Sequence, residues 1–241
     1  MIPLTLKTNN QTSTSPDWEQ LRGVVPIYKP LNWTSHDVVG KLRRLTKEKR
    51  IGHGGTLDPL ADGVLIIGIG RESTKKLASF ASGEKTYQTV VRLGITSQTL
   101  DGEGPLTKSD IEKTPTQKEV DSVVKMFKGE ILQTPPVYSA LKISGVPAYK
   151  LARRGQAVEL MPRTVNVSQI ICDQYSYPDI RLTITCSGGT YIRSIARDIG
   201  EKLQTGAYMQ ALTRTAVGTY TLADCLLLPT NKNAGLCELQ K

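Results

Sequence analysis

Apolar and polar positions follow two different periods along the chain, so the sequence predicts a mixture of strands and helices. Strands are predicted where the pattern alternates or forms a short apolar run, at residues 23–30, 63–70, 85–94, 163–175, 180–189 and 208–220. Helices are predicted where apolar side chains recur every three or four positions, at residues 34–50, 73–82, 116–130 and 190–203. Several strands follow one another through short turns. We therefore expect an α+β fold with a mixed, largely antiparallel central sheet flanked by helices.

Three stretches lack such a pattern. Residues 1–20 are polar and are expected to form a flexible N-terminal tail, and residues 223–241 are expected to form a short C-terminal tail. One domain is expected between them, over residues 21–222. Within it, residues 134–155 are basic and contain tyrosines, and we predict that they form no regular secondary structure.

The charge balance gives the first functional indication. The chain has 31 basic and 22 acidic residues, a net charge of +9. From charge alone, a nucleic-acid partner and a merely soluble basic protein are equally good interpretations. The predicted helix at 34–50 carries a nearly uniform basic face. A face that serves only solubility more often mixes signs, so we favour a surface that contacts phosphates.

Several classes of protein are excluded. No apolar run reaches the roughly 20 residues of a membrane helix, and the N-terminus does not resemble a signal peptide. Four scattered cysteines and two histidines, with no C-x-x-C pair, argue against a metal site and suit the cytoplasm. We therefore expect a cytoplasmic protein that neither associates with a membrane nor binds a metal. The sequence also lacks a P-loop, a complete dinucleotide fingerprint and a nucleophilic serine motif.

One stretch, "GHGGTLDPLADGVL" at residues 52–65, places a carboxylate inside a glycine-rich turn. An aspartate before a proline is most often a turn former, which is the simpler interpretation of Asp58. The alternative is chemical, because glycines let the backbone approach a ligand closely. A carboxylate in such a loop, basic surfaces and tyrosines near arginines together suit RNA chemistry.

Five motifs in order carry a resemblance to a known family. They are "KPLNWTSHDVV", "GHGGTLDPLADGVL", "KTYQTVVRLG", "TPPVYSALKISGVPAYKLARRG" and the closing pair "GGTYIRSIARDIG" and "ALTRTAVG". Over residues 22–220 the chain resembles the TruB family of tRNA pseudouridine synthases. The resemblance implies the pseudouridine synthase fold with a basic thumb insertion at about residues 130–155. It also implies conversion of the uridine at position 55, in the T loop of tRNA, to pseudouridine without metal or cofactor. We expect a monomer that binds the T stem-loop.

The resemblance also assigns catalytic roles by position. Asp58 is expected to be the catalytic aspartate, Arg193 to pair with it, and Tyr87 to stack on the flipped base. A carboxylate suits this isomerisation because it can attack or stabilise an electron-poor carbon and then depart. An arginine beside it favours the ionised form and fixes the plane of the carboxylate.

Four further residues are expected to bind substrate. His53 is expected in the RNA-facing part of the glycine-rich loop. Tyr191 and Leu212 are expected to line the pocket, and Lys29 to contribute from the first motif. Each has a simpler interpretation as a core or loop-supporting residue. The joint arrangement of the motifs supports the functional one.

Three departures from the family pattern are visible. Asn32 stands where glycine is usual, and asparagine also tolerates a left-handed backbone. Asp62 stands where Ser or Thr is common. It either perturbs Asp58 or caps the next element, and we favour the cap. Only about 20 residues follow residue 220, so the small RNA-binding PUA domain of many members is expected to be absent.

Two alternatives to a tRNA-modifying enzyme stay open. One is a non-catalytic tRNA-binding or RNA-folding protein of the same fold. The other is a synthase that acts on a different RNA. The joint retention of Asp58, Tyr87 and Arg193 favours an enzyme.

Overall fold

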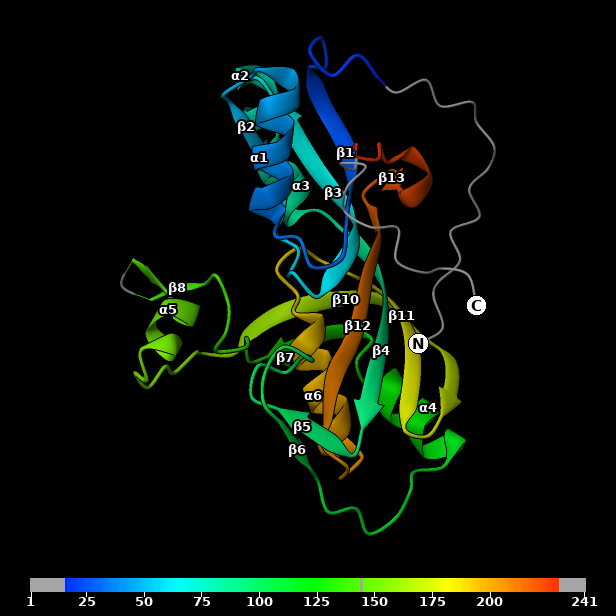
Figure 1. The fold of residues 1–241 in the computed structure, drawn as a ribbon. Helices are drawn as coiled ribbons and strands as arrows, with labels where there is room; N and C mark the ends of the chain where they lie inside the picture. The colour runs from blue at the N-terminus through cyan, green and yellow to red at the C-terminus, as the bar shows by residue number, and fades with distance from the viewer. Residues whose placement is uncertain (1–15, 144, 230–241) are drawn as a thin grey trace.

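A nine-stranded sheet forms the centre of the structure (Figure 1). The computed structural model describes residues 16–143 and 145–229. Along the main path the strands are β1 (Gly23–Lys29), β3 (Ala61–Ile69), β12 (Ala207–Val217), β4 (Lys85–Leu93), β11 (Asp179–Cys186), β10 (Arg163–Ser176) and β7 (Gly129–Gln133). Only β3 and β12 pair in parallel; the other pairs along this path are antiparallel. The predicted mixed, largely antiparallel sheet is confirmed.

Helices occur at the predicted places, but with different ends, and one further helix, at Ala148–Arg153, lies in the segment predicted to be irregular. They are α1 (Ser35–Thr46), α2 (Arg71–Lys75), α3 (Leu77–Ser82), α4 (Gln117–Lys125), α5 (Ala148–Arg153) and α6 (Ile192–Lys202). A capping box starts α1 at Thr34 and another starts α4 at Thr116. The prediction that the first helix reaches residue 50 is wrong. Lys47 takes a left-handed conformation (φ 57°), which ends the helix after Thr46.

Two other predicted helices also differ in extent. The single helix expected at 73–82 is two short helices, α2 and α3, which meet at Lys76. The helix expected to reach residue 130 ends at Lys125 because the chain turns at Gly129 (φ 95°) into β7. There it pairs with the start of β10, so tertiary pairing overrides the helical pattern.

Several short elements were not predicted. They are β2 (Ile51–His53), β5 (Ile95–Ser97), β6 (Leu106–Lys108), β8 (Lys142–Ile143), β9 (Val146–Pro147), β13 (Tyr220–Thr221) and the 3-10 turn η1 (Leu222–Asp224). The prediction that residues 134–155 are irregular is wrong, because β8 and β9 form a small hairpin there and α5 follows it. We call residues 134–162 the thumb. In Figure 1 the thumb stands away from the sheet.

Two buried clusters meet near the glycine-rich loop. The larger one lies between the sheet and helices α4 and α6. The second lies between α1 and strands β1 and β3. Leu57 belongs to the first cluster and Ile51 to the second. The loop between them is therefore held from both sides.

The predicted tails lie partly outside the described residues. Of the N-terminal tail, residues 1–15 are not described, but Trp18 packs against the second cluster. At the other end, residues 230–241 are not described, and Leu226 forms a bridge to Ile27. The stretch at 16–22 and the stretch at 222–229 thus contact the domain. No helix among the described residues is long and apolar enough to cross a membrane.

The structure tests the predictions made for Asn32 and Asp62, the two positions that depart from the family pattern. Asn32 has a φ of 64°, so the predicted left-handed turn is confirmed. The prediction that Asp62 caps an element is wrong, because β3 begins already at Ala61 and Asp62 lies within it. Its carboxylate instead accepts a hydrogen bond of 2.6 Å from the Tyr28 hydroxyl. Burial, together with this carboxylate, raises the pKa of Tyr28.

Candidate active site

The loop that carries Asp58, residues 54–60, is held by the first motif on both sides of the aspartate. The Ser35 hydroxyl donates to the Leu57 carbonyl at 3.1 Å and accepts from the Leu57 N–H at 2.9 Å. The Asn32 N–H donates to the Pro59 carbonyl at 2.8 Å. We call residues 54–60 the acidic loop. The backbones of Leu57 and Pro59, the two neighbours of Asp58, are therefore both held by hydrogen bonds from one turn.

A buried arginine holds the other end of the acidic loop. Arg214, on β12, donates to the carbonyls of Gly55 at 3.2 Å, Thr56 at 3.4 Å and Val64 at 2.7 Å. Gly63 lies opposite Arg214 in the parallel pair, and a Cβ there would come within 2.2 Å of the Arg214 carbonyl oxygen. Glycine is therefore required at this position. The sequence motif contains Arg214, but nothing in it distinguishes a buried arginine from a surface one.

Asp58 meets Arg193 as expected. Arg193 is the second residue of α6, and its Nε lies 3.1 Å from the Asp58 Oδ2. The Nε–H is not aligned with that oxygen, so the contact is an ion pair rather than a hydrogen bond. The rest of the guanidinium donates to Asp101 Oδ2 at 3.1 Å, to the Thr99 carbonyl at 3.1 Å and to the Tyr138 carbonyl at 3.0 Å.

Arg193 thus bridges two carboxylates that differ in exposure. The Asp101 side chain is 2% exposed, and the Asp58 side chain is 34% exposed. Asp101 also accepts from the Thr99 hydroxyl at 2.5 Å and from the Glu103 N–H at 3.0 Å. Asp58 is therefore the carboxylate of this pair that solvent and a substrate can reach. Sequence analysis missed Asp101, which lies in a stretch without apolar periodicity.

Tyr87 and Leu212 lie in the core directly beneath the acidic loop. Both belong to the same buried cluster as Leu57, and Tyr87 on β4 pairs in register with Arg214 on β12. Burial raises the pKa of the Tyr87 hydroxyl, which stays protonated at neutral pH. The structure therefore brings these two predicted pocket residues together with the residue next to Asp58.

Tyr191 is positioned by its backbone and by a cation. It is the N-cap residue of α6, where its N–H donates to Gln133 Oε1 at 2.8 Å and its carbonyl accepts from Gln133 Nε2 at 3.1 Å. The guanidinium of Arg163 lies 5.0 Å from the centre of its ring. Because Gln133 ends β7 and Arg163 begins β10, two neighbouring strands fix this tyrosine.

His53 lies on β2 at the start of the acidic loop. Its ring meets the His36 ring edge to face, with 5.6 Å between the ring centres. Its Nδ1 is buried and has no hydrogen-bond partner in the described part of the chain. Burial and the nearby His36 lower its pKa, which favours the neutral imidazole.

Lys29 lies inside the protein at the first motif. Its side chain is fully buried, and its amine donates to the carbonyls of Pro30 at 2.9 Å and Trp33 at 2.5 Å. Burial lowers the pKa of Lys29 to about 8, although the nearby Asp62 opposes the shift. The structure thus gives Lys29 a supporting place under the first motif rather than an open position toward RNA.

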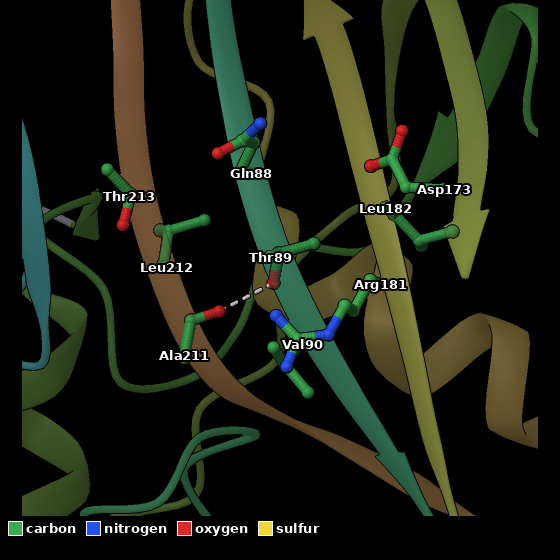
Figure 2. Close-up of a pocket in the computed structure, with 9 residues that line it drawn as sticks. All are labelled: Gln88, Thr89, Val90, Asp173, Arg181, Leu182, Ala211, Leu212 and Thr213. Carbon is green, nitrogen blue, oxygen red and sulfur yellow. Dashed lines mark hydrogen bonds between the residues drawn. The ribbon is translucent and has the colours of Figure 1, made fainter. Parts of the chain in front are cut away.

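A cavity lies at the sheet, over four neighbouring strands (Figure 2). Its polar lining comes from Gln88, Asp173, Arg181 and Thr213, over strands β4, β10, β11 and β12. On β4, Gln88 alternates with Tyr87, which belongs to the same buried cluster as Leu57. Leu212, which is predicted to line the pocket for the flipped base, is among the residues that line this cavity.

The described residues form no cluster of side chains suited to metal coordination. Within residues 16–143 and 145–229, no group of three or more His, Cys, Asp or Glu side chains could hold a metal ion. The charged groups around Asp58 pair with one another instead. What the arrangement offers is one accessible carboxylate oriented by a buried guanidinium.

Known structures share this fold. The chain is similar to a chain in the crystal structure of a Cbf5–Nop10–Gar1 complex, with 29% identity and a TM-score of 0.64, covering 83% of this chain and 50% of that one. It is also similar to a chain in an H/ACA ribonucleoprotein bound to a substrate RNA containing 2′-deoxyuridine. That match has 26% identity and a TM-score of 0.63 and covers 91% of this chain and 59% of that one. This chain spans about half to three fifths of both neighbours.

Relatives in sequence are closer. A protein named tRNA pseudouridine synthase B from Opitutus terrae is 40% identical over 223 residues, which cover 92% of each chain. A protein of the same name from Bacteroides fragilis is 43% identical over 209 residues, covering 84% of this chain and 89% of that one. One family model, the N-terminal domain of TruB family pseudouridylate synthases, matches residues 43–192. The tRNA pseudouridylate synthase B C-terminal domain matches residues 193–233. The resemblance seen in the five motifs is therefore confirmed, and this chain belongs to the TruB family of pseudouridylate synthases.

Proposed function

We propose that this chain is a tRNA pseudouridine synthase that isomerises the uridine at position 55 in the T loop, with Asp58 as its catalytic carboxylate. The activity follows from the family and from relatives that carry this name over most of the chain. The observation that supports the role of Asp58 is its ion pair with Arg193, which is itself anchored by the buried Asp101. We further propose that the protein acts as a monomer on the T stem-loop, without metal or cofactor.

The reaction needs a group that acts at the sugar or the base and then leaves. The bond between ribose C1′ and uracil N1 breaks, the base turns, and C5 joins C1′. The proton on C5 is lost and N1 gains one, so the product is an isomer of the substrate. Asp58 supplies the carboxylate for this exchange, by attack on C1′, by attack on C6 or by deprotonation of the sugar. Arg193 holds that carboxylate in one orientation throughout.

The target base must leave the stack of its loop, which costs a few kcal/mol. Stacking on an aromatic ring returns about 1–3 kcal/mol per base. We propose that Tyr87 provides this ring, that Leu212 and Tyr191 form the pocket wall, and that His53 faces the RNA. The shared cluster of Leu57, Tyr87 and Leu212 supports this assignment. We propose that Lys29 serves the substrate site by positioning the first motif, because its amine binds two carbonyls there.

The test is chemical mapping of pseudouridine in tRNA incubated with purified protein, comparing the wild type with Asp58→Asn. Asparagine is nearly isosteric, so the acidic loop should persist, but the amide is a poor nucleophile and base. We expect product at position 55 with the wild type and only background with the variant. The tRNA affinity should change little, because phosphate contacts dominate it.

Two outcomes contradict this proposal. Substantial product from Asp58→Asn would remove Asp58 from the chemistry. Binding of tRNA by both proteins without product from either would favour a non-catalytic tRNA-binding or RNA-folding protein.

A further inference from the structure

A group of basic side chains lies at the end of α1 and β3 that is far from Asp58. We call it the basic end. Its members are exposed and come from two segments, residues 44–50 and residues 71–76. They are Arg44, Lys47, Lys49, Arg50, Arg71, Lys75 and Lys76.

The fold brings the two segments together. β2 pairs with the last residues of β3, with Ile51 opposite Ile69. The Gly70 N–H donates to the Arg50 carbonyl at 2.8 Å, directly before α2 begins. The left-handed Lys47 turns the chain from the end of α1 toward β2. The basic end is therefore one surface, formed where α1, β2 and α2 meet (Figure 1).

Acidic residues neutralise little of this surface. Glu72 pairs with Lys75 at 2.8 Å. Glu48 lies 3.9 Å from Arg22 and accepts from the Arg50 N–H at 2.8 Å. In the part of the chain that the structure describes, the remaining side chains of the basic end form no ion pair. A surface with so large an excess of one sign fits an extended anion better than it serves solubility alone.

The position of the basic end relative to Asp58 follows from two elements. α1 starts at Ser35, which contacts the acidic loop, and its 12 residues span about 18 Å. β3 starts beside Asp58, where the Ala61 N–H bonds the Asp58 carbonyl, and its 9 residues span about 30 Å. Both elements lead away from Asp58 to the basic end. A nucleotide loop seated at Asp58 would not cover that distance, but a helical stem continuing from it would.

We propose that the basic end binds the phosphate backbone of the tRNA stem that continues beyond the T arm. This rests on the proposed function, which seats the T loop at Asp58. The segments that form the basic end contain no aromatic residue, so bases have no ring to stack on there. The contact is therefore with the backbone. It is independent of base sequence and sensitive to salt.

The test compares a variant of the basic end with one that removes the same charge elsewhere. The first carries Lys47→Gln, Lys49→Gln and Arg50→Gln. The control carries Lys118→Gln, Lys125→Gln and Lys128→Gln, which are exposed on and just after α4. The Kd of full-length tRNA and the Kd of an isolated T-arm hairpin are measured against salt concentration. Pseudouridine formation in the hairpin is measured in parallel.

We expect the basic-end variant to bind full-length tRNA more weakly. The slope of log Kd against log salt concentration should become smaller by about two to three, because three cationic side chains are removed. Its binding to the hairpin, and its product yield there, should match the wild type. The control should match the wild type on both RNAs.

Equal weakening on the hairpin, or an equal effect of the control, would overturn the proposal. So would an unchanged slope for full-length tRNA. Failure of the wild type to modify either RNA would instead overturn the proposed function. The salt dependence of tRNA binding would still test whether the basic end binds the phosphate backbone.

Discussion

The acidic loop and the thumb are both segments without a regular sequence pattern, yet the structure holds them in opposite ways. Hydrogen bonds fix the acidic loop along its length: from Arg214 at its start, and from Ser35 and Asn32 on either side of Asp58. These contacts come from elements far away in the sequence. Two separate parts of the fold, the first motif and β12, must be in place before the loop takes its form.

Among the described residues, the hydrogen bonds that join the thumb to the rest of the chain lie near its base. The Ser194 hydroxyl donates to the Thr134 carbonyl at 2.8 Å, and Arg193 donates to the Tyr138 carbonyl at 3.0 Å. Farther out, the thumb packs on itself, with the Tyr149 N–H bonded to the Ser139 carbonyl at 3.1 Å. It extends away from the sheet (Figure 1).

The difference matches two physical demands. A reacting group must be held close to one geometry, because small misplacements cost rate. A segment that closes on RNA must be able to move, so it comes from the part of a fold with few buried contacts. Arg193 touches both regions, through Asp58 and through the Tyr138 carbonyl. Variants around it therefore test whether the two regions are separable.

The largest effect on rate in this comparison is expected for Arg193→Lys. Lysine keeps the charge but loses the planar fork that reaches Asp58, Asp101 and Tyr138 at once. We expect the single-turnover rate of pseudouridine formation to fall by about 10²–10³, while the Kd of tRNA stays unchanged. Near-normal turnover would show that Arg193 is not the partner Asp58 needs. A large loss of affinity would show that the thumb and the acidic loop are not separable.

A smaller loss is expected for Asp101→Asn. The amide keeps the shape, but Arg193 then balances only one carboxylate, so its position relative to Asp58 shifts. A hydrogen bond to a charged group contributes about 1.5–3 kcal/mol, which corresponds to a rate loss of about tenfold to a hundredfold. The control is Asp110→Asn, an exposed aspartate nine residues farther on. If both variants react at the wild-type rate, the buried carboxylate has no part in orienting Arg193.

Asp101 also shows what the sequence could not predict. Alternating apolar residues revealed β4 and β11, because one face of each strand is buried. Asp101 and Arg214 are buried charges whose partners lie far along the chain. In the sequence they are indistinguishable from solvated surface residues. Only the fold makes their burial and pairing visible.

The site itself was predictable to different degrees. The pairing of Asp58 with Arg193 came from the family resemblance and not from any spacing rule. The burial of Lys29 could not be predicted, because a lysine in a proline-containing turn carries no signal of burial. The strand β7 was missed because it has only five residues and Leu132 in it is exposed. Pairing with β10, rather than its own pattern, creates it.

A modest effect is expected for Ser35→Ala. It removes both hydrogen bonds to Leu57, each contributing about 1 kcal/mol. Asp58 should then sample more orientations, so kcat falls about fivefold to thirtyfold while KM for tRNA stays the same. Ser82→Ala is the matched control, because the Ser82 hydroxyl bonds only carbonyls within α3. A change in KM with kcat intact would mean that Ser35 serves RNA binding and not the position of Asp58.

The smallest effect concerns the thumb and leaves the chemistry untouched. Lys142, Lys150, Arg153 and Arg154 are exposed trypsin sites on a segment with few contacts to the sheet. We expect trypsin to cut there first in the free protein, and the cutting to slow several-fold when tRNA is added. Asp58→Asn is the protein to use, because it binds tRNA without turning it over. Arg92, held in β4 by its ion pair with Asp179, provides a reference site that should resist trypsin with or without RNA. Equal cutting of the thumb in both conditions would mean that it is as preformed as the acidic loop, and the contrast between the two regions would then lie only in their partners.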